Sequence, residues 1–317
     1  MQKRRASLSS ARMANQRRAV IDVGSNSVKL LVADVSDGQV KPVKAKGKQT
    51  RLGKGVFKTG RLQQDRIDET VRVIGKFSDK ARTLGATDLR VLATSAAREA
   101  ANGDDFERAV AVHGVELEII AGEEEANLIL RGVRTHPNFA KGPLAVIDVG
   151  GGSTELLVAD GDRLLTQASH PLGTVRWLDR HPPSDPPTVG DRKAVRDSIE
   201  DFLQTTIVPQ LRGIALPNKL VASGGSPKFL TRLVEGTRDL SMEQLEAREV
   251  TVNEIRQLAN QLWSLPIDTR RKLPGMSAKR ADVLLMGAAI YEAIMGQFGF
   301  KALRPSMRGV RYGALLN

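Results

Sequence analysis

The amino-acid sequence predicts an α/β protein with two domains of one topology that face each other across a shared cleft. At 317 residues the chain exceeds a single average domain. The stretch "VIDVGSNSVKLLVAD", residues 20–34, returns as "VIDVGGGSTELLVAD", residues 146–160, with 11 of 15 positions identical. Predicted strands alternate with predicted helices in the first half of the chain, which is typical of α/β folds. The repeat therefore indicates duplication of one strand–turn–strand unit.

In the first half, the elements follow from their residue patterns. Residues 20–33 are two apolar runs around a glycine turn and predict a hairpin, and the second copy predicts another. Residues 40–62 are basic and glycine-rich, which indicates a strand and a loop. Residues 63–84 have apolar side chains at helical spacing. Residues 88–100 and 115–133 each predict a strand, a turn and a helix.

The second half is longer and more helical. Residues 181–191, "HPPSDPPTVGD", are proline-rich and predict a surface loop. Helical patterns cover residues 192–211, 252–263 and 280–298. Between the first two, "NKLVASGGSPKF", which begins at Asn218, predicts a strand and a glycine turn.

Composition excludes several classes of protein. The chain has no cysteine, which excludes disulfides, thiolate catalysis and cysteine-bound zinc and fits a cytoplasmic location. No apolar run is long enough for a membrane helix. The net charge of +12 suits a polyanionic partner. Residues 1–18 contain six basic and no acidic side chains, and we expect a disordered tail in which Met1 or Met13 is the true start. The predicted domains are residues 19–133 and 134–317.

Each copy of the repeat has a turn that suits phosphate binding. Glycine lacks a β-carbon, so the main chain can approach a ligand closely and can adopt positive φ. Backbone N–H groups and hydroxyls can then surround phosphate oxygens. The candidate phosphate-binding residues are Gly24, Ser25, Asn26 and Ser27 in the first turn and Gly150, Gly151, Gly152, Ser153 and Thr154 in the second. One such turn is usually structural, but two facing turns suit adjacent phosphates.

Charged residues accompany both turns. Asp22 and Asp148 end the strands before the turns, where they could bind a magnesium ion between phosphates, directly or through water. Lys29 in the first copy is replaced by Glu155 in the second. One side thus offers a cation for phosphate and the other a carboxylate for metal or water. The alternative is that both are exposed hairpin residues.

Three other segments carry candidate residues. Glu123–Glu125 begin a predicted helix, where acidic residues commonly stabilise the helix dipole and where one carboxylate could instead activate a water molecule. Arg98 follows a strand and could bind a transferring phosphoryl group, or be an ordinary surface arginine. Ser223, Gly224 and Gly225 form a third glycine turn that could bind phosphates or nucleotide, or simply turn the chain.

Seven segments together resemble the exopolyphosphatase and guanosine pentaphosphate phosphatase family. In chain order they are "IDVGSNSVKLLV", "TSAAREA", "IIAGEEEANLILRGV", "VIDVGGGSTELLV", "PLGTVR", "ASGG" and "PGMSAKRADVLLMGAAI". That family belongs to the actin-like ATPase superfamily. The resemblance, which runs from about residue 20 to 316, therefore implies two ribonuclease-H-like domains facing a shared interdomain cleft.

The resemblance also implies a chemistry, the magnesium-dependent hydrolysis of a terminal phosphoanhydride, with Mn²⁺ as an alternative ion. Carried over by position, it places the catalytic base at Glu124 and a phosphate-binding arginine at Arg98. It places metal-linked carboxylates at Asp148 and Glu155, with Asp22 as the acidic residue of the first loop. Glu124 is chosen over its neighbours only through this resemblance.

We therefore expect a cytoplasmic exopolyphosphatase that releases orthophosphate from inorganic polyphosphate. Hydrolysis of guanosine pentaphosphate is the close alternative, because both branches share these motifs, and a non-catalytic nucleotide-binding regulator is another. We expect no membrane or nucleic-acid partner, and family members often form homodimers. Longer members append further domains, so this chain resembles the short two-domain form. Ser226 and Tyr312 stand where threonine and an acidic residue are frequent.

Overall fold

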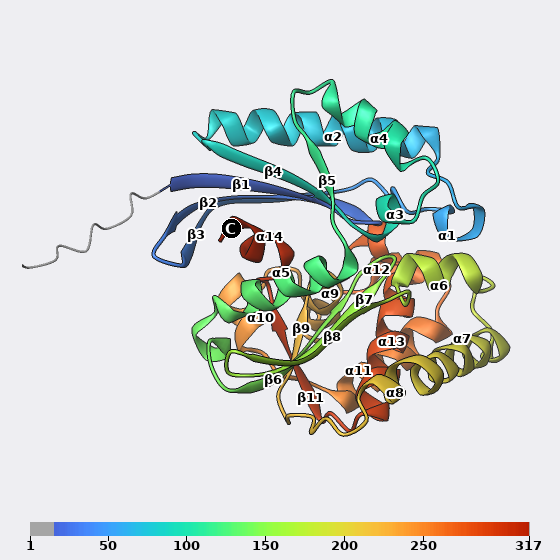
Figure 1. Cartoon of the computed structure of the whole chain (residues 1–317). Coiled ribbons are helices and arrows are strands. Elements are labelled where there is room, and N and C mark those ends of the chain that lie inside the picture. Colours follow the sequence, from blue (N-terminus) through green and yellow to red (C-terminus); the bar gives the residue numbers. More distant parts are fainter. Residues whose placement is uncertain (1–15, 317) are drawn as a thin grey trace, which may run out of the picture.

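The computed structural model describes residues 16–316, and its first β-sheet is built by the N-terminal third of the chain (Figure 1). The strand order is β3-β2-β1-β4-β5. The first three strands form an antiparallel meander, and β4 and β5 add parallel to β1. The strands are β1 Gln16–Val23, β2 Ser27–Ser36, β3 Gln39–Gln49, β4 Asp88–Ala93 and β5 Leu117–Ile119.

The second sheet repeats this topology with one additional edge strand. Its order is β10-β11-β9-β6-β7-β8, in which β6, β7 and β8 form the meander and β9 and β11 follow in parallel. The strands are β6 Pro143–Val149, β7 Thr154–Asp160, β8 Arg163–His170, β9 Leu220–Ser223, β10 Val250–Thr251 and β11 Ala302–Ser306. The predicted α/β class and the predicted duplication are both confirmed.

Long helices cover the outer face of each sheet (Figure 1). On the first sheet, α2 buries Ile67, Ile74 and Phe77, which lie on one face because successive members are seven and three residues apart. This helix confirms the prediction for residues 63–84. The covering helices are α2 Gln64–Thr83 and α4 Gly103–Ala111 on the first sheet, and α7 Val189–Phe202, α11 Val252–Ser264 and α13 Leu284–Gln297 on the second.

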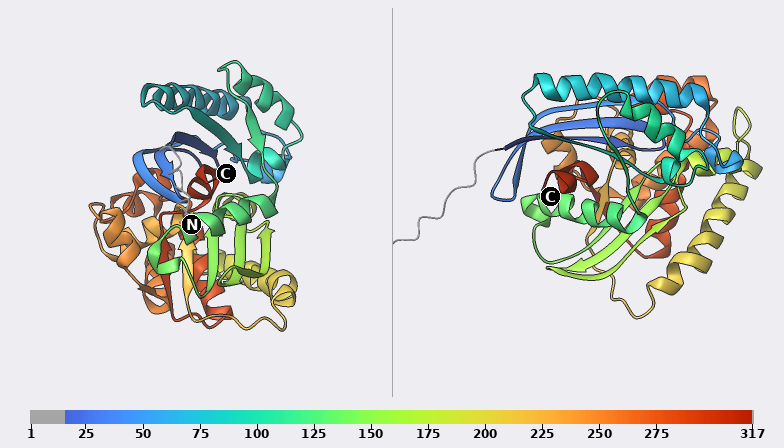
Figure 2. Two further views of the ribbon diagram at one scale, coloured as in Figure 1. Left: turned by 60° about the vertical axis from the view of Figure 1, so that its left-hand side comes forward. Right: turned by 45° about the horizontal axis from the view of Figure 1, so that its top comes forward.

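Two helices, α5 (Gly122–Arg134) and α14 (Val310–Leu315), lie between the two sheets (Figures 1 and 2). They share one buried apolar cluster with side chains from both sheets, including Leu31 and Leu157. A β-carbon on Gly313 would lie 2.0 Å from the Leu128 carbonyl oxygen, so the close crossing of these helices requires glycine. The proposed division at residues 133 and 134 therefore falls inside a layer that both sheets use.

Shorter helices connect these elements. They are α1 Val56–Thr59, α3 Ser95–Arg98, α6 Thr174–Arg180, α8 Val208–Gln210, α9 Ser226–Val234, α10 Met242–Ala247 and α12 Ile267–Lys272. The helix predicted over 192–211 is interrupted, because residues Leu203–Ile207 form a π-helical turn between α7 and α8.

The predicted end of the basic tail, residue 18, lies three residues beyond its end in the structure, where β1 begins at Gln16. Residues 1–15 lie outside the described part of the chain, but Gln16 already begins β1. Arg17 forms an ion pair with Asp34 of β2, with 2.8 Å between Nε and Oδ1. Within residues 16–316, no helix has both the length and the apolar character needed to cross a membrane.

Candidate active site

The two repeated turns face each other across a pocket between the sheets. In each copy the glycine amide donates to a serine carbonyl oxygen, Gly24 to Ser27 at 3.1 Å and Gly150 to Ser153 at 2.9 Å. The strand registers also correspond, because Asp22 pairs with Lys29 and Asp148 with Glu155. We call this space the interdomain pocket. Its lining includes Asp22, Ser25, Asn26, Ser27, Lys29, Ser95, Glu125, Asp148, Gly151, Gly152, Ser153, Glu155, Gly225, Ser226 and Arg280.

Close packing requires two glycines of the second turn, Gly151 and Gly152. A β-carbon on Gly152 would lie 2.3 Å from Ser95 Oγ and 2.4 Å from Phe57 Cζ, both of which belong to the first half of the chain. One on Gly151 would lie 3.0 Å from Ser25 Cβ. The prediction of positive φ is wrong here, because neither glycine, nor Gly24 or Gly150, has it. Larger side chains would push the two turns apart.

Four carboxylates meet in the interdomain pocket. Asp22, Glu125 and Glu155 are 8%, 7% and 1% exposed. Burial, followed by the charge of Asp148, raises the pKa of Glu155 to about 7. Burial also raises the pKa of Asp148 and raises that of Glu125 well above its ordinary value, with the Glu155 charge as the next cause. So much repelling negative charge in a buried space is typical of a cation site or of a catalytic site.

Hydroxyl groups orient two of these carboxylates. Ser223 Oγ donates to Asp148 Oδ2 at 3.0 Å, and Ser169 Oγ donates to Glu155 Oε1 at 2.7 Å. Ser223, a predicted phosphate ligand, is completely buried and does not line the pocket. Its neighbour Gly224 does have positive φ, +91°, and a β-carbon there would lie 2.2 Å from Asp148 Oδ1. The third turn thus positions Asp148, and only Gly225 reaches the interdomain pocket.

The structure places Glu124, the predicted catalytic base, outside the pocket and its neighbour Glu125 inside it. Glu124 is exposed on α5, whereas Glu125 is buried and lines the pocket. Successive residues on a helix differ by about 100° in direction, so only one of the three can face the two turns. The sequence prediction chose Glu124 through the family resemblance, and the sequence did not reveal the register of α5 against the pocket.

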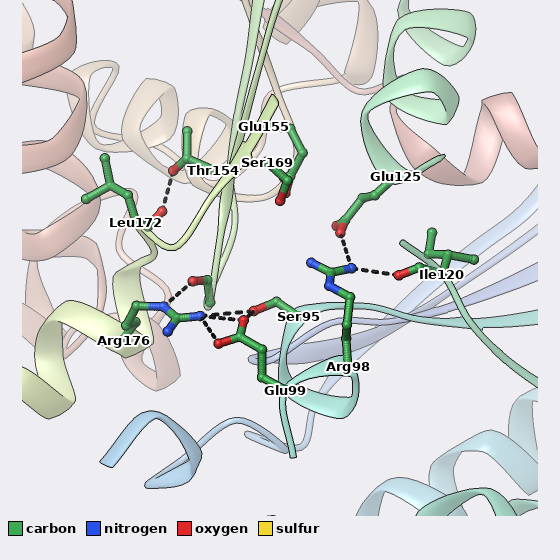
Figure 3. A network of polar contacts seen from close by, with 11 residues as sticks. Ser95, Arg98, Glu99, Ile120, Glu125, Thr154, Glu155, Ser169, Leu172 and Arg176 are labelled. Carbon is green, nitrogen blue, oxygen red and sulfur yellow. Dashed lines mark hydrogen bonds and ion pairs between the residues drawn. The ribbon is translucent and has the colours of Figure 1, made fainter. Parts of the chain in front are cut away.

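Arg98 lies next to Glu125, and its guanidinium already contacts two groups of the protein (Figure 3). Its Nη1 donates to the Ile120 carbonyl oxygen at 2.7 Å and lies 3.3 Å from Glu125 Oε2. The guanidinium does not line the pocket. Arg98 therefore positions Glu125, and the predicted direct contact with phosphate is not prepared in this structure.

Two cations do line the pocket. Lys29, the predicted phosphate-binding cation of the first hairpin, lines the pocket, and its Nζ lies 3.6 Å from Asp22 Oδ2. Arg280, which precedes α13, donates to Ser27 Oγ at 2.7 Å and joins the two halves of the molecule. Burial lowers the pKa of Arg280 to about 10. Sequence reasoning missed Arg280, although it stands in the quoted segment "PGMSAKRAD".

A buried arginine outside the predicted site holds the second turn (Figure 3). Arg176 on α6 donates from Nε to the Gly152 carbonyl oxygen at 2.6 Å. Its Nη2 donates to both carboxylate oxygens of Glu99, at 2.6 and 2.8 Å. The guanidinium carbon lies 3.9 Å from the centre of the Phe57 ring. Arg176 therefore ties the second turn to α1 and to the end of α3, and "PLGTVR" was the only signal for it.

Thr154, also predicted to bind phosphate, hydrogen-bonds within the protein instead. Its hydroxyl donates to the Leu172 carbonyl oxygen, and the residue is completely buried without lining the pocket. The remaining turn residues, Ser25, Asn26, Ser27 and Ser153, do line it.

Comparisons with known proteins agree with this geometry. Exopolyphosphatase 1 of Mycobacterium leprae is 31% identical over 302 residues, which cover 95% of this chain and 88% of the relative. Exopolyphosphatase 2 of Mycobacterium tuberculosis is 31% identical over 296 residues, 89% of this chain and 91% of the relative. The solved PPX-GPPA enzyme of Aquifex aeolicus superposes with a TM-score of 0.78 at 28% identity, covering 95% of this chain and 99% of that one.

The family model for Ppx/GppA phosphatases matches residues 31–317, which include the second turn, Glu125 and the helical layer between the sheets. The repeated turns, the facing sheets and the carboxylates of the interdomain pocket lead to the same assignment, and the chain belongs to the Ppx/GppA phosphatase family.

Proposed function

We propose that this protein is an exopolyphosphatase, which hydrolyses the terminal phosphoanhydride of inorganic polyphosphate and releases orthophosphate. The observation that carries the proposal is the interdomain pocket, where two serine-containing turns face each other beside four carboxylates. The names of the relatives, exopolyphosphatases at 31% identity over most of the chain, support the choice of substrate.

The two turns would bind the last phosphates of the chain. Ser25, Ser27 and Ser153 present hydroxyls to the pocket, which can donate to phosphate oxygens. Lys29 and Arg280 would neutralise charge on those oxygens, because both line the same space. Binding two adjacent phosphates from opposite sides would hold the scissile P–O bond in one orientation.

We assign the activation of the attacking water to Glu125. It lines the pocket, and its raised pKa makes the ionised carboxylate a better base than an ordinary glutamate. In the proposed step, a water oxygen bonds to the terminal phosphorus while the bridging P–O bond breaks. The water proton passes to Glu125, and the bond electrons stay on the shortened polyphosphate. Arg98 holds the carboxylate in place through its contact at 3.3 Å.

The carboxylate set fits a magnesium ion that is shared with the substrate. Among residues 16–316, no group of three acidic, histidine or cysteine side chains is arranged to hold a metal by itself. Mg²⁺ commonly binds through one or two carboxylates, several waters and substrate phosphates. Asp22 and Asp148 would hold it, with Glu155 acting through water. The bound ion would offset the repulsion among these carboxylates and neutralise charge on the phosphates.

The test is orthophosphate release by the purified protein from polyphosphate, with and without Mg²⁺, and from guanosine pentaphosphate in parallel. We expect release from polyphosphate that stops when the metal is chelated. Release from guanosine pentaphosphate alone would move the protein to the nucleotide branch of its family. No release from either substrate would leave the pocket as a binding site and refute the proposal.

A further inference from the structure

A second chamber opens beside the interdomain pocket, between β3, α9 and α14. The two spaces are continuous, because several residues line both of them. The shared residues are Asp22, Lys29, Asp148, Gly225, Arg280 and Val310. A ligand that extends out of the interdomain pocket on this side would enter the chamber.

The chamber is strongly basic. Its lining carries five basic side chains, Lys29, Lys46, Lys228, Arg280 and Arg311. We call it the cationic chamber. Among residues 16–316, its acidic lining residues are Asp22 and Asp148, which also line the interdomain pocket.

Three of the chamber's cations form no ion pair within residues 16–316, although the charges of Asp22 and Asp148 act on Arg311. In the described part of the chain, the ion pairs do not include Lys46, Lys228 or Arg311. Burial lowers the pKa of the Lys228 amine, and the charges of Arg232 and Arg311 lower it further. A cluster in which cations outnumber carboxylates is typical of an anion-binding surface.

The chamber has few side chains that could recognise a nucleobase by hydrogen bonds. Its lining within residues 16–316 contains no asparagine, glutamine, serine or threonine, and the hydroxyl of Tyr312 is the exception among neutral polar groups. Apolar side chains support the cations instead: the Arg280 guanidinium carbon lies 4.5 Å from the centre of the Phe229 ring. Recognition here would depend on charge, which suits a linear polyanion without a base.

We propose that the cationic chamber binds the internal phosphates of a polyphosphate whose terminal phosphate lies in the interdomain pocket. This inference rests on the proposed exopolyphosphatase function. Lys46 is the outermost of these cations, because it lies exposed on the edge strand β3, where Lys44 and Lys48 are exposed as well. Long chains would therefore gain contacts that a chain of three phosphates lacks.

The experiment compares tripolyphosphate with long-chain polyphosphate as substrates of the wild type and of the Lys46→Glu/Lys228→Glu variant. Neither residue lines the interdomain pocket. We expect the ratio of kcat/KM for long chains to kcat/KM for tripolyphosphate to fall about ten-fold or more in the variant, through KM. The matched control is Lys219→Glu/Lys301→Glu, which makes the same charge change beyond the opposite end of β9. Its ratio should equal that of the wild type.

An unchanged ratio in the Lys46→Glu/Lys228→Glu variant, with an active wild type, would overturn the inference and leave the proposed function intact. If the wild type hydrolyses neither substrate, the proposed function fails. Calorimetric binding of long-chain polyphosphate then tests the chamber separately, with weaker binding by the variant expected. A site that binds guanosine pentaphosphate more tightly than polyphosphate, and loses that affinity in the variant, would contradict the choice of ligand.

Discussion

Replacing Arg176 by methionine should destabilise the protein by about 3 kcal/mol, because the guanidinium satisfies buried groups on both halves of the molecule. The Arg176 side chain is only 5% exposed. The Gly152 carbonyl oxygen, which receives its Nε at 2.6 Å, is in a buried residue and would lose its donor. An unsatisfied buried carbonyl costs about 1–3 kcal/mol.

The second part of the loss comes from Glu99 and Phe57. The Glu99 side chain is 40% exposed, so water would solvate the carboxylate after its partner is removed, and we assign about 1 kcal/mol to that pair. Loss of the guanidinium above the Phe57 ring adds about 0.5–1 kcal/mol, which the methionine side chain partly replaces by packing.

Urea unfolding followed by circular dichroism measures the effect. The matched control is Arg271→Met, which breaks an exposed pair with Asp268 one helical turn away and should change the free energy of unfolding by less than about 0.5 kcal/mol. A loss below about 1 kcal/mol in Arg176→Met would refute the idea that this residue holds the second turn against the first half of the chain.

Three other predictions concern single residues. Gly224→Ala should lower kcat at least about ten-fold, because its β-carbon would displace Asp148. The control Gly236→Ala, also at positive φ but without a close contact, should lower only the stability. Equal kcat values in the two variants would contradict this prediction. Thr154→Val should lower the free energy of unfolding by about 1 kcal/mol and leave KM unchanged, because the Thr154 hydroxyl donates to the Leu172 carbonyl oxygen. A raised KM would instead support the predicted role of Thr154 in phosphate binding. Hydrogen bonds from Thr188 and Ser184 lower the pKa of Asp191 to about 2, so its stabilising effect should be complete above about pH 4 and disappear as the pH falls towards 2. Asp191→Asn should remove that part of the pH dependence. If the urea midpoint falls by the same amount in both proteins between about pH 4 and pH 2, the prediction is contradicted.

Local sequence predicted the strands and turns well because their signals are local. Alternating and β-branched residues around a glycine turn specify a hairpin wherever they occur. The repeat then implied that Asp22 and Asp148 take equivalent places, and the registers with Lys29 and Glu155 agree. The facing arrangement followed from the same duplication.

The errors arose where tertiary packing decides the outcome. The direction of Glu125 depends on how α5 packs against β8 and α14, which the triplet itself does not reveal. The Thr154 hydroxyl and the Arg98 guanidinium found partners within the protein, Leu172 in one case and Glu125 in the other. The return of α14 to the first sheet was not predicted, because its contacts lie almost 300 residues away in sequence, as in the bond from Arg311 to Leu30.

Arg280 illustrates the same limit for function. Its segment was quoted in the resemblance, yet no local pattern distinguishes it from the other basic residues of the chain. Only the fold brings it from the start of α13 to Ser27 of the first turn and to the boundary between the interdomain pocket and the cationic chamber.

The first measurement should be kcat for orthophosphate release from polyphosphate by two neighbouring variants, Glu125→Gln and Glu124→Gln. Each replaces a carboxyl group by an amide of the same shape, and only Glu125 lines the interdomain pocket. We predict that Glu125→Gln lowers kcat by about 10²–10⁴ while polyphosphate binding persists, and that Glu124→Gln stays within about three-fold of the wild type. Full activity in Glu125→Gln together with its loss in Glu124→Gln would contradict the assignment of the catalytic base.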